Sequence, residues 1–264
     1  IRVADRKEKE SKMILRFEIF AALVVLAISI SSGVGADEWF VDRSVGVSGD
    51  GTTWDTAFDT IQKGIDAASN DDTVTVGEGT YVENIQFNGK DIVLRSTDPL
   101  DRSVVQGTII DGGEAGPVVT FSGLESEACV LSGFTIRNGK SDAGGGIYSG
   151  TAEESHAHAA IQNNIVVGNS AESGGGLAYC DGTIQNNVIT DNFAQFQGGG
   201  LAYCDGIIQN NTITDNQTDH AGGGLAYCHG TIRNNAITSN WADSGSGGGL
   251  AWCGGRIENN LIAN

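Results

Sequence analysis

The chain has 264 residues and a formal net charge of −18 at pH 7, from 15 Lys and Arg against 33 Asp and Glu. This acidic excess repels phosphate backbones and anionic lipid, so nucleic acid and membrane surfaces are disfavoured as partners. Glycine is abundant, at 39 residues, and proline occurs twice. Since the apolar residues recur in register, this composition is typical of a turn-rich β-protein rather than of a disordered chain.

The N-terminal segment has the pattern of a secretory leader. Residues 1–12 mix charges without periodicity and are interpreted as an upstream extension. Around Met13, Lys12 and Arg16 precede a short, mostly apolar run at 19–30, and small residues at 34–36 end in an Ala-x-Ala-like cleavage site. The run is short for a transmembrane helix, although an uncleaved anchor is the alternative. We therefore expect residues 1–36 to be leader and signal peptide, and the protein to be secreted or on the cell surface, without membrane insertion after cleavage.

The first part of the remaining domain, residues 37–264, has irregular spacing and one helical pattern. Apolar residues from Phe58 to Ala68 recur at the spacing of one helical face, which predicts a helix over residues 55–69. Short apolar runs predict strands at 39–42, 73–76, 92–95, 104–110, 118–121 and 130–136.

An insertion interrupts the pattern at residues 150–159. The glycine triplet at 144–146 recurs 30 residues later at 174–176, whereas later triplets recur every 24 or 25 residues. The inserted residues include Glu153, Glu154, His156 and His158. A His-x-His pair on extended chain places both imidazoles on one side, so with a carboxylate such as that of Glu153 it is a candidate metal site. The alternative is an exposed polar loop.

The last part of the chain is a strict repeat. Gly-Gly-Gly-Leu-Ala-Tyr-Cys at 174–180 returns at 198–204, at 222–228 and, with Trp for Tyr, at 247–253. A period of 24 or 25 residues indicates a solenoid, and the short apolar runs suit strands of three to five residues rather than the helices of leucine-rich repeats. We expect three strands and three bends in each coil.

Residues one period apart should stack at the parallel-strand spacing of about 4.8 Å. Three apolar columns follow, led by Leu177, Ile184 and Ile189. An asparagine ladder is expected at the bend between the second and third columns, because Asn tolerates left-handed backbone and its amide can bond to the next coil. Its members are Asn187, Asn211, Asn235 and Asn260; a second ladder comprises Asn169, Asn192, Asn216 and Asn240.

The motif Ile-x-x-Asn-x-Ile-x-x-Asn, present at 184–192, and the glycine triplet opening each coil resemble the right-handed parallel β-helix proteins of the pectate-lyase-like superfamily, of the secreted bacterial type. The resemblance implies an all-β fold, a right-handed single-stranded parallel β-helix whose end is capped by the helix at 55–69. That superfamily includes lyases, hydrolases, esterases and non-catalytic surface proteins, so the reaction stays open. Because residue 264 falls inside a coil, we expect the C-terminus to be truncated.

Two more columns of the repeat contain side chains that could take part in chemistry or binding. Cys180, Cys204, Cys228 and Cys253 are expected to form a ladder of free thiols packed as small apolar groups, with oxidised pairs as the alternative. Tyr179, Tyr203, Tyr227 and Trp252 form an aromatic column. Strand alternation from the leucine two residues earlier places this column in the core; facing outward, it would offer a platform for sugar rings.

Carboxylates also recur. Asp191 and Asp215 lie one period apart and are candidate Ca²⁺ ligands. Asp181 and Asp205 precede glycine, and turn formation alone explains them. Arg233 and Arg256 share no column, so the acidic cluster beside a basic residue that Ca²⁺-dependent pectate lyases would require is not visible.

These observations predict an exported β-helix repeat protein, a monomer that binds polysaccharide or a cell-surface glycan along its flank. The alternative is a polysaccharide-degrading enzyme, a pectate-lyase-like lyase or a glycosidase. Its site would lie on the irregular N-terminal coils, on the insertion at 150–159 or in a missing C-terminal part.

Overall fold

The computed structural model describes residues 35–150 and 156–263. The chain separates into two compact units, residues 1–36 and Asp37–Asn264. The first unit lies almost wholly outside the described residues, so the signal peptide stays a prediction. Among the described residues, no helix combines the length and apolar character needed to span a bilayer.

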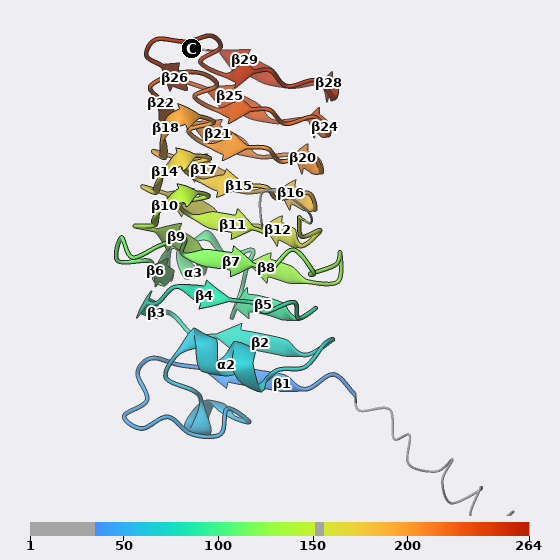
Figure 1. Ribbon diagram of the computed structural model, residues 1–264. Coiled ribbons are helices and arrows are strands. Elements are labelled where there is room, and N and C mark those ends of the chain that lie inside the picture. The colour runs from blue at the N-terminus through green and yellow to red at the C-terminus, as the bar shows by residue number, and fades with distance from the viewer. Residues whose placement is uncertain (1–34, 151–155, 264) are drawn as a thin grey trace, which may run out of the picture. The chain divides into compact units, whose positions relative to one another are not determined.

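The second unit winds into a parallel β-helix (Figure 1), which confirms the expected fold class. Strands of successive coils pair in parallel and in register, so that Ile184 lies beside Ile208 and Ile208 beside Ile232. Each later coil contributes to four sheets, which we name A to D, rather than to the three expected.

Sheets A and B carry the two longest ladders. Sheet A contains β1 (Glu38–Val41), β2 (Thr73–Val76), β5 (Val93–Ser96), β8 (Val130–Ser132), β12 (Ala160–Gln162), β16 (Thr183–Gln185), β20 (Ile207–Gln209), β24 (Thr231–Arg233) and β28 (Arg256–Glu258). Sheet B contains β3 (Gly79–Val82), β6 (Thr108–Asp111), β9 (Thr135–Arg137), β13 (Ile165–Val167), β17 (Val188–Thr190), β21 (Thr212–Thr214), β25 (Ala236–Thr238) and β29 (Leu261–Ala263).

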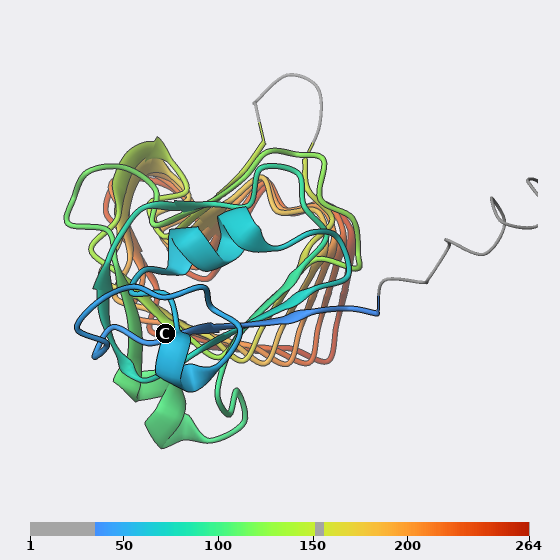
Figure 2. The same cartoon turned by 90° about the horizontal axis from the view of Figure 1, so that it is seen from below.

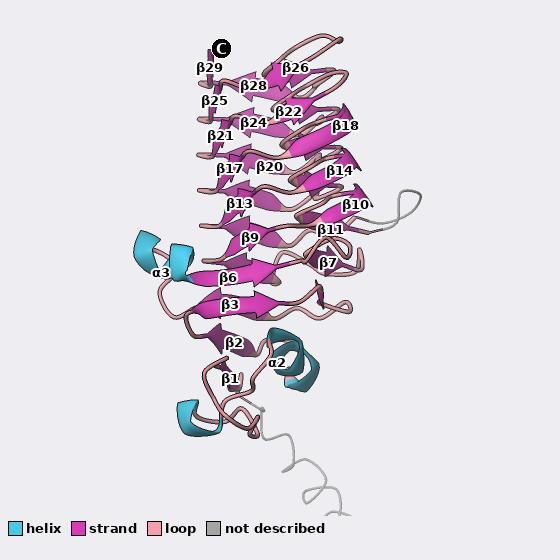
Figure 3. Ribbon diagram, turned by 90° about the vertical axis from the view of Figure 1, so that its left-hand side faces the viewer, coloured by secondary structure: helices cyan, strands magenta, loops and turns pink. Residues whose placement is uncertain are grey.

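Sheets C and D complete the coils. Sheet C contains β4 (Ile85–Gln86), β7 (Val119–Phe121), β11 (Ile147–Ser149), β15 (Leu177–Ala178), β19 (Leu201–Ala202), β23 (Leu225–Ala226) and β27 (Leu250–Ala251). Sheet D, the unexpected one, contains β10 (Lys140–Ala143), β14 (Ser170–Ser173), β18 (Phe193–Gln197), β22 (Gln217–Thr218) and β26 (Trp241–Ala242). Figure 3 shows its strands stacked beside those of sheet B.

The capping helix is present but shorter than expected. Residues 54–56 form a 3-10 turn, η1 (Trp54–Thr56), and helix α2 spans only Ile61–Ala67. The chain between them is extended, because Phe58 exchanges backbone hydrogen bonds with Phe40 and Asp42. The Glu83 carboxylate accepts the N–H groups of the first two residues of α2 and so fixes its start. The buried Ile61 and Ile65 close the core at this end, over which α2 lies in Figure 2.

One expected strand is partly wrong. Residues 102–107 form helix α3 (Arg102–Gly107), and strand β6 starts only at Thr108. Asp101 caps α3, since its carboxylate accepts the N–H of Ser103 at 2.8 Å. Helix α3 lies beside the stack of sheet B in Figure 3.

The interior consists of the expected columns. Leu177, Ile184 and Ile189 are fully buried, as are their counterparts in the next two coils. Burial of each such side chain contributes roughly 1.5–3 kcal/mol. The coils therefore gain most of their stability by stacking.

Asparagines fix the bends between these columns. At the bend from sheet A to sheet B, Asn186 has a positive φ of 57°, and Asn187 is buried. The Asn187 amide oxygen accepts the backbone N–H of Asn164 at 2.9 Å, and Asn187 in turn bonds to Asn211. The same arrangement continues through Asn235 and Asn260. The second ladder, from Asn169 to Asn240, bonds likewise.

Candidate functional site

The aromatic column lies on the surface, so the expectation that it faces the core is wrong. Tyr179, Tyr203 and Tyr227 are half-buried, and Trp252 is 54% exposed. Each of the four has a left-handed backbone, with φ between 51° and 61°. This conformation interrupts the strand alternation: the alanine before each aromatic residue is buried, as are the first three cysteines that follow. The aromatic side chain is thereby turned outward.

The aromatic rings stack on one another along the solenoid axis. Tyr179 and Tyr203 have centroids 5.1 Å apart and an interplanar angle of 7°, and Tyr203 and Tyr227 are 5.1 Å apart at 8°. Tyr227 stacks on Trp252 at 4.8 Å. Because each inner ring covers much of its neighbour's face, the column presents mainly ring edges and hydroxyl groups to solvent. Stacking of sugars on this column is correspondingly restricted.

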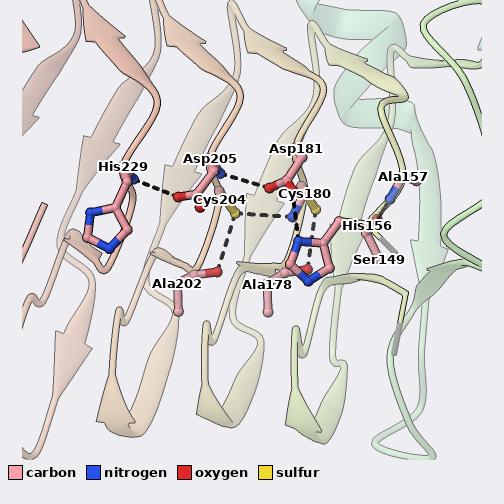
Figure 4. A network of polar contacts seen from close by, with 10 residues as sticks. All are labelled: Ser149, His156, Ala157, Ala178, Cys180, Asp181, Ala202, Cys204, Asp205 and His229. Atoms are coloured by element: carbon pink, nitrogen blue, oxygen red, sulfur yellow. Dashed lines mark hydrogen bonds and ion pairs between the residues drawn. The ribbon is translucent and has the colours of Figure 1, made fainter. Parts of the chain in front are cut away.

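A row of polar side chains follows the cysteine column, one residue further along each coil (Figure 4). The Asp181 carboxylate accepts the backbone N–H of Asp205 at 2.9 Å, and the Asp205 carboxylate accepts that of His229 at 2.6 Å. His229 continues the row, since its Nδ1 accepts the N–H of Gly254 at 3.1 Å. These side chains tie successive coils together at the bend from sheet C to sheet A.

His156 joins this row from the insertion. Its Nδ1 lies 2.8 Å from the Asp181 Oδ2, and its ring centroid is 5.1 Å from that of Tyr179. The structure thus pairs His156 with Asp181, a partner that sequence spacing did not indicate. His158 is exposed, and Glu153 lies outside the described residues. The metal site on the insertion therefore stays a prediction.

The other candidate metal ligands lie at a different bend. Asp191 and Asp215 occupy the turn from sheet B to sheet D with φ of 54° and 55°, and each carboxylate accepts the hydroxyl of the preceding threonine. The structure does not bring them near His156. Within residues 35–150 and 156–263, no three His, Cys, Asp or Glu side chains are placed to hold one metal ion. The geometry of Asp191 and Asp215 suits a turn-forming role.

The cysteines are free thiols. Cys180, Cys204 and Cys228 are buried, and each thiol bonds to the carbonyl oxygen of the alanine two residues earlier at 3.4–3.5 Å. Burial, with the neighbouring thiols, raises the pKa of Cys204 and Cys228 well above the usual value. The thiol is the form favoured here, so the column serves packing rather than nucleophilic chemistry.

A groove runs over the outer face of sheet D and has a volume of about 720 Å³. It is lined by Glu114, Lys140, Ser141, Asp142, Ser170, Ala171, Glu172, Phe193, Gln195 and Asp219. Its floor follows the strand register: Ala171 and Ala194 point inward and are buried, while the residues flanking them point outward. Sequence reasoning missed this site because sheet D was not expected. The acidic residue that recurs as Asp142, Glu172 and Asp219 was an available signal.

Two smaller cavities are weaker candidates for a binding site. A cavity of about 150 Å³ lies between α3 and the bend from sheet A to sheet B, with Arg102 and Asn163 in its lining. A second, of about 480 Å³, lies over the apolar residues of the last coil, including Leu250 and Ile262. Neither combines aromatic with charged side chains.

Comparison of the chain with models of protein families, with curated proteins and with solved structures gave no match. The function is therefore inferred from the geometry of the chain itself.

Proposed function

We propose that this is an exported, monomeric β-helix protein of the pectate-lyase-like superfamily that binds polysaccharide or a cell-surface glycan along its flank. The groove over sheet D is the observation that supports this proposal. Its lining comes from four successive coils, from β10 to the residue after β22, and most of its charged side chains are exposed, as binding of a linear polymer requires. The leader pattern at residues 1–36 supports a location on the cell surface or outside the cell.

The groove offers the groups that recognise sugars. Phe193 is 36% exposed, and no aromatic stacking partner covers it within the described part of the chain. Trp241 lies two coils further along the same outward column and is 61% exposed. Aromatic faces pack on the apolar faces of sugar rings, while Ser170, Gln195 and the carboxylates supply hydrogen-bonding groups.

Strand β18 provides a matched test. Phe193 lines the groove, whereas Phe196 on the same strand is equally exposed, at 37%, and packs on His220 instead. We expect Phe193→Ala to weaken glycan binding about three- to tenfold, and Phe196→Ala to leave it nearly unchanged. Binding is measured by affinity electrophoresis and calorimetry on neutral, acidic and amino-sugar polysaccharides. Equal effects of the two substitutions, or no binding to any polymer, would contradict the proposal.

The pairing of His156 with Asp181 favours a second candidate, a polysaccharide-degrading enzyme with its site on the insertion. An imidazole bonded to a carboxylate through Nδ1 is held in one orientation and can exchange a proton through Nε2. Tyr179 lies beside it and supplies a hydroxyl group. Such a constellation suits general acid–base chemistry on a bound polymer.

This second candidate predicts turnover that depends on His156. Release of unsaturated or reducing sugar ends is followed on a polysaccharide panel, with and without chelator. His156→Gln and Asp181→Asn should each lower the rate at least a hundredfold, and His158→Gln, a change on the same segment, should not. A protein that turns over no polymer of the panel would exclude this candidate and leave the binding proposal standing.

A further inference from the structure

The groove over sheet D carries an excess of negative charge. Four carboxylates, those of Glu114, Asp142, Glu172 and Asp219, line it against the single ammonium group of Lys140. Lys140 is itself paired with Glu114, at 3.7 Å, and both side chains are largely exposed. An acidic polysaccharide would meet net repulsion here.

The remaining carboxylates are distributed along the groove rather than gathered at one point. The register of β10 with β14 places Asp142 beside Glu172, and the residue after β22, Asp219, lies two coils beyond Glu172. Coils are about 4.8 Å apart. A Ca²⁺ ion needs six to eight oxygen ligands at about 2.3–2.6 Å, and no described group of three acidic or other ligating residues can hold one ion. The spacing instead suits a ligand with positive charges along its length.

We propose that the groove binds a polymer of amino sugars with free amino groups; this inference rests on the proposed glycan-binding function. The ammonium groups pair with Asp142, Glu172 and Asp219, one after another along the solenoid axis. Phe193, in the neighbouring outward column, contacts the apolar face of a sugar ring and adds cation–π attraction. Gln195, at the uncharged position of the acidic column, bonds a hydroxyl group.

A basic peptide fits this surface less well. An extended peptide binds a sheet by adding a strand to an open edge, where backbone groups are unpaired. The strands of sheet D pair with one another from β10 to β26, so the groove presents the face of the sheet and not an edge. Side-chain contacts alone would have to hold the peptide, without a sugar ring for Phe193 to contact.

The test compares three probes on the purified protein by calorimetry, at pH about 5.5. The probes are a fully deacetylated glucosamine oligomer, its N-acetylated counterpart and an oligolysine of similar length. Glu172→Gln with Asp219→Asn removes two groove charges, and neither side chain forms a hydrogen bond with the residues that the structure describes. Asp55→Asn with Asp71→Asn makes the same charge change at exposed positions far along the chain.

We expect the deacetylated oligomer to bind at least tenfold more tightly than the acetylated one. Its affinity should fall as the NaCl concentration rises from about 50 to 300 mM. The groove variant, Glu172→Gln with Asp219→Asn, should bind the deacetylated oligomer about five- to tenfold more weakly and the acetylated one unchanged. The control variant, Asp55→Asn with Asp71→Asn, should keep nearly the full affinity for both. Phe193→Ala should weaken both oligomers.

Three results would overturn the inference. Equal affinity for the two sugar oligomers would refute the role of charge and leave glycan binding intact. Oligolysine binding as tightly as the deacetylated oligomer, with no effect of Phe193→Ala, would mark a surface for basic peptides. If the protein binds none of the three probes and no polysaccharide, this inference and the proposed function are both refuted.

Discussion

Substitution of Asn211 by alanine tests whether the asparagine ladder holds the coils together. The Asn211 side chain is 2% exposed. Its Oδ1 accepts the backbone N–H of Asn187 at 2.9 Å, and its Nδ2 donates to the carbonyl oxygen of Ile184 at 2.8 Å. Alanine would leave the Asn187 N–H and the Ile184 oxygen without these partners in the interior.

The expected cost follows from these two groups. A buried polar group that loses its partner costs about 1–3 kcal/mol, so Asn211→Ala, which affects two such groups, should lower the free energy of unfolding by about 2–6 kcal/mol. The control is Asn210→Gly at the same bend. Asn210 is exposed and has a φ of 56°, a conformation that glycine adopts without strain, so this change should cost less than about 1 kcal/mol.

Urea unfolding followed by far-UV circular dichroism measures both variants. Because solenoids can unfold coil by coil, the slope of the transition is compared along with its midpoint. If Asn211→Ala unfolds at the same urea concentration as Asn210→Gly, with an unchanged slope, the ladder does not stabilise the bend and the reasoning is refuted.

Three further predictions concern burial and close packing. Because burial raises the pKa of Cys204 and Cys228, both thiols should resist iodoacetamide at pH about 8.5 in the native protein and react in urea; rapid native labelling would show that the column is open. Burial raises the pKa of Tyr81 to about 12, so the neutral phenol is favoured in the fold. The stability this provides should be complete below pH about 10 and lost between about 10 and 12, seen as delayed phenolate absorbance that Tyr81→Phe removes. Gly199→Ala should lower the melting temperature by several degrees, because a Cβ there would collide with backbone of the next coil; an unchanged melting temperature would contradict that packing.

The interior of this protein could be predicted from its sequence because stacking makes the repeat visible. Leu177, Ile184 and Asn187 recur at one period, and vertical pairing places each beside its counterpart. No tertiary information beyond the period was needed for these columns.

The surface could be predicted less well, for two physical reasons. Tyr179 takes a left-handed conformation, and a single such residue reverses the inside–outside alternation on which the parity argument depended. Sheet D was harder to recognise because most of its outward residues differ from coil to coil, and what recurs is small inward residues such as Ala171 and Ala194 and an intermittent acidic position. The pairing of His156 with Asp181 joins residues 25 apart, across an insertion that breaks the period.

The outward column of sheet D contains Lys140, Ser170, Phe193, Gln217 and Trp241, a different residue in every coil. The inward neighbours stay small, so each outward position can change without disturbing the packing beneath it. If this surface binds a polymer as proposed, evolution can therefore alter that affinity one coil at a time, and an engineer could change the preference in the same stepwise way.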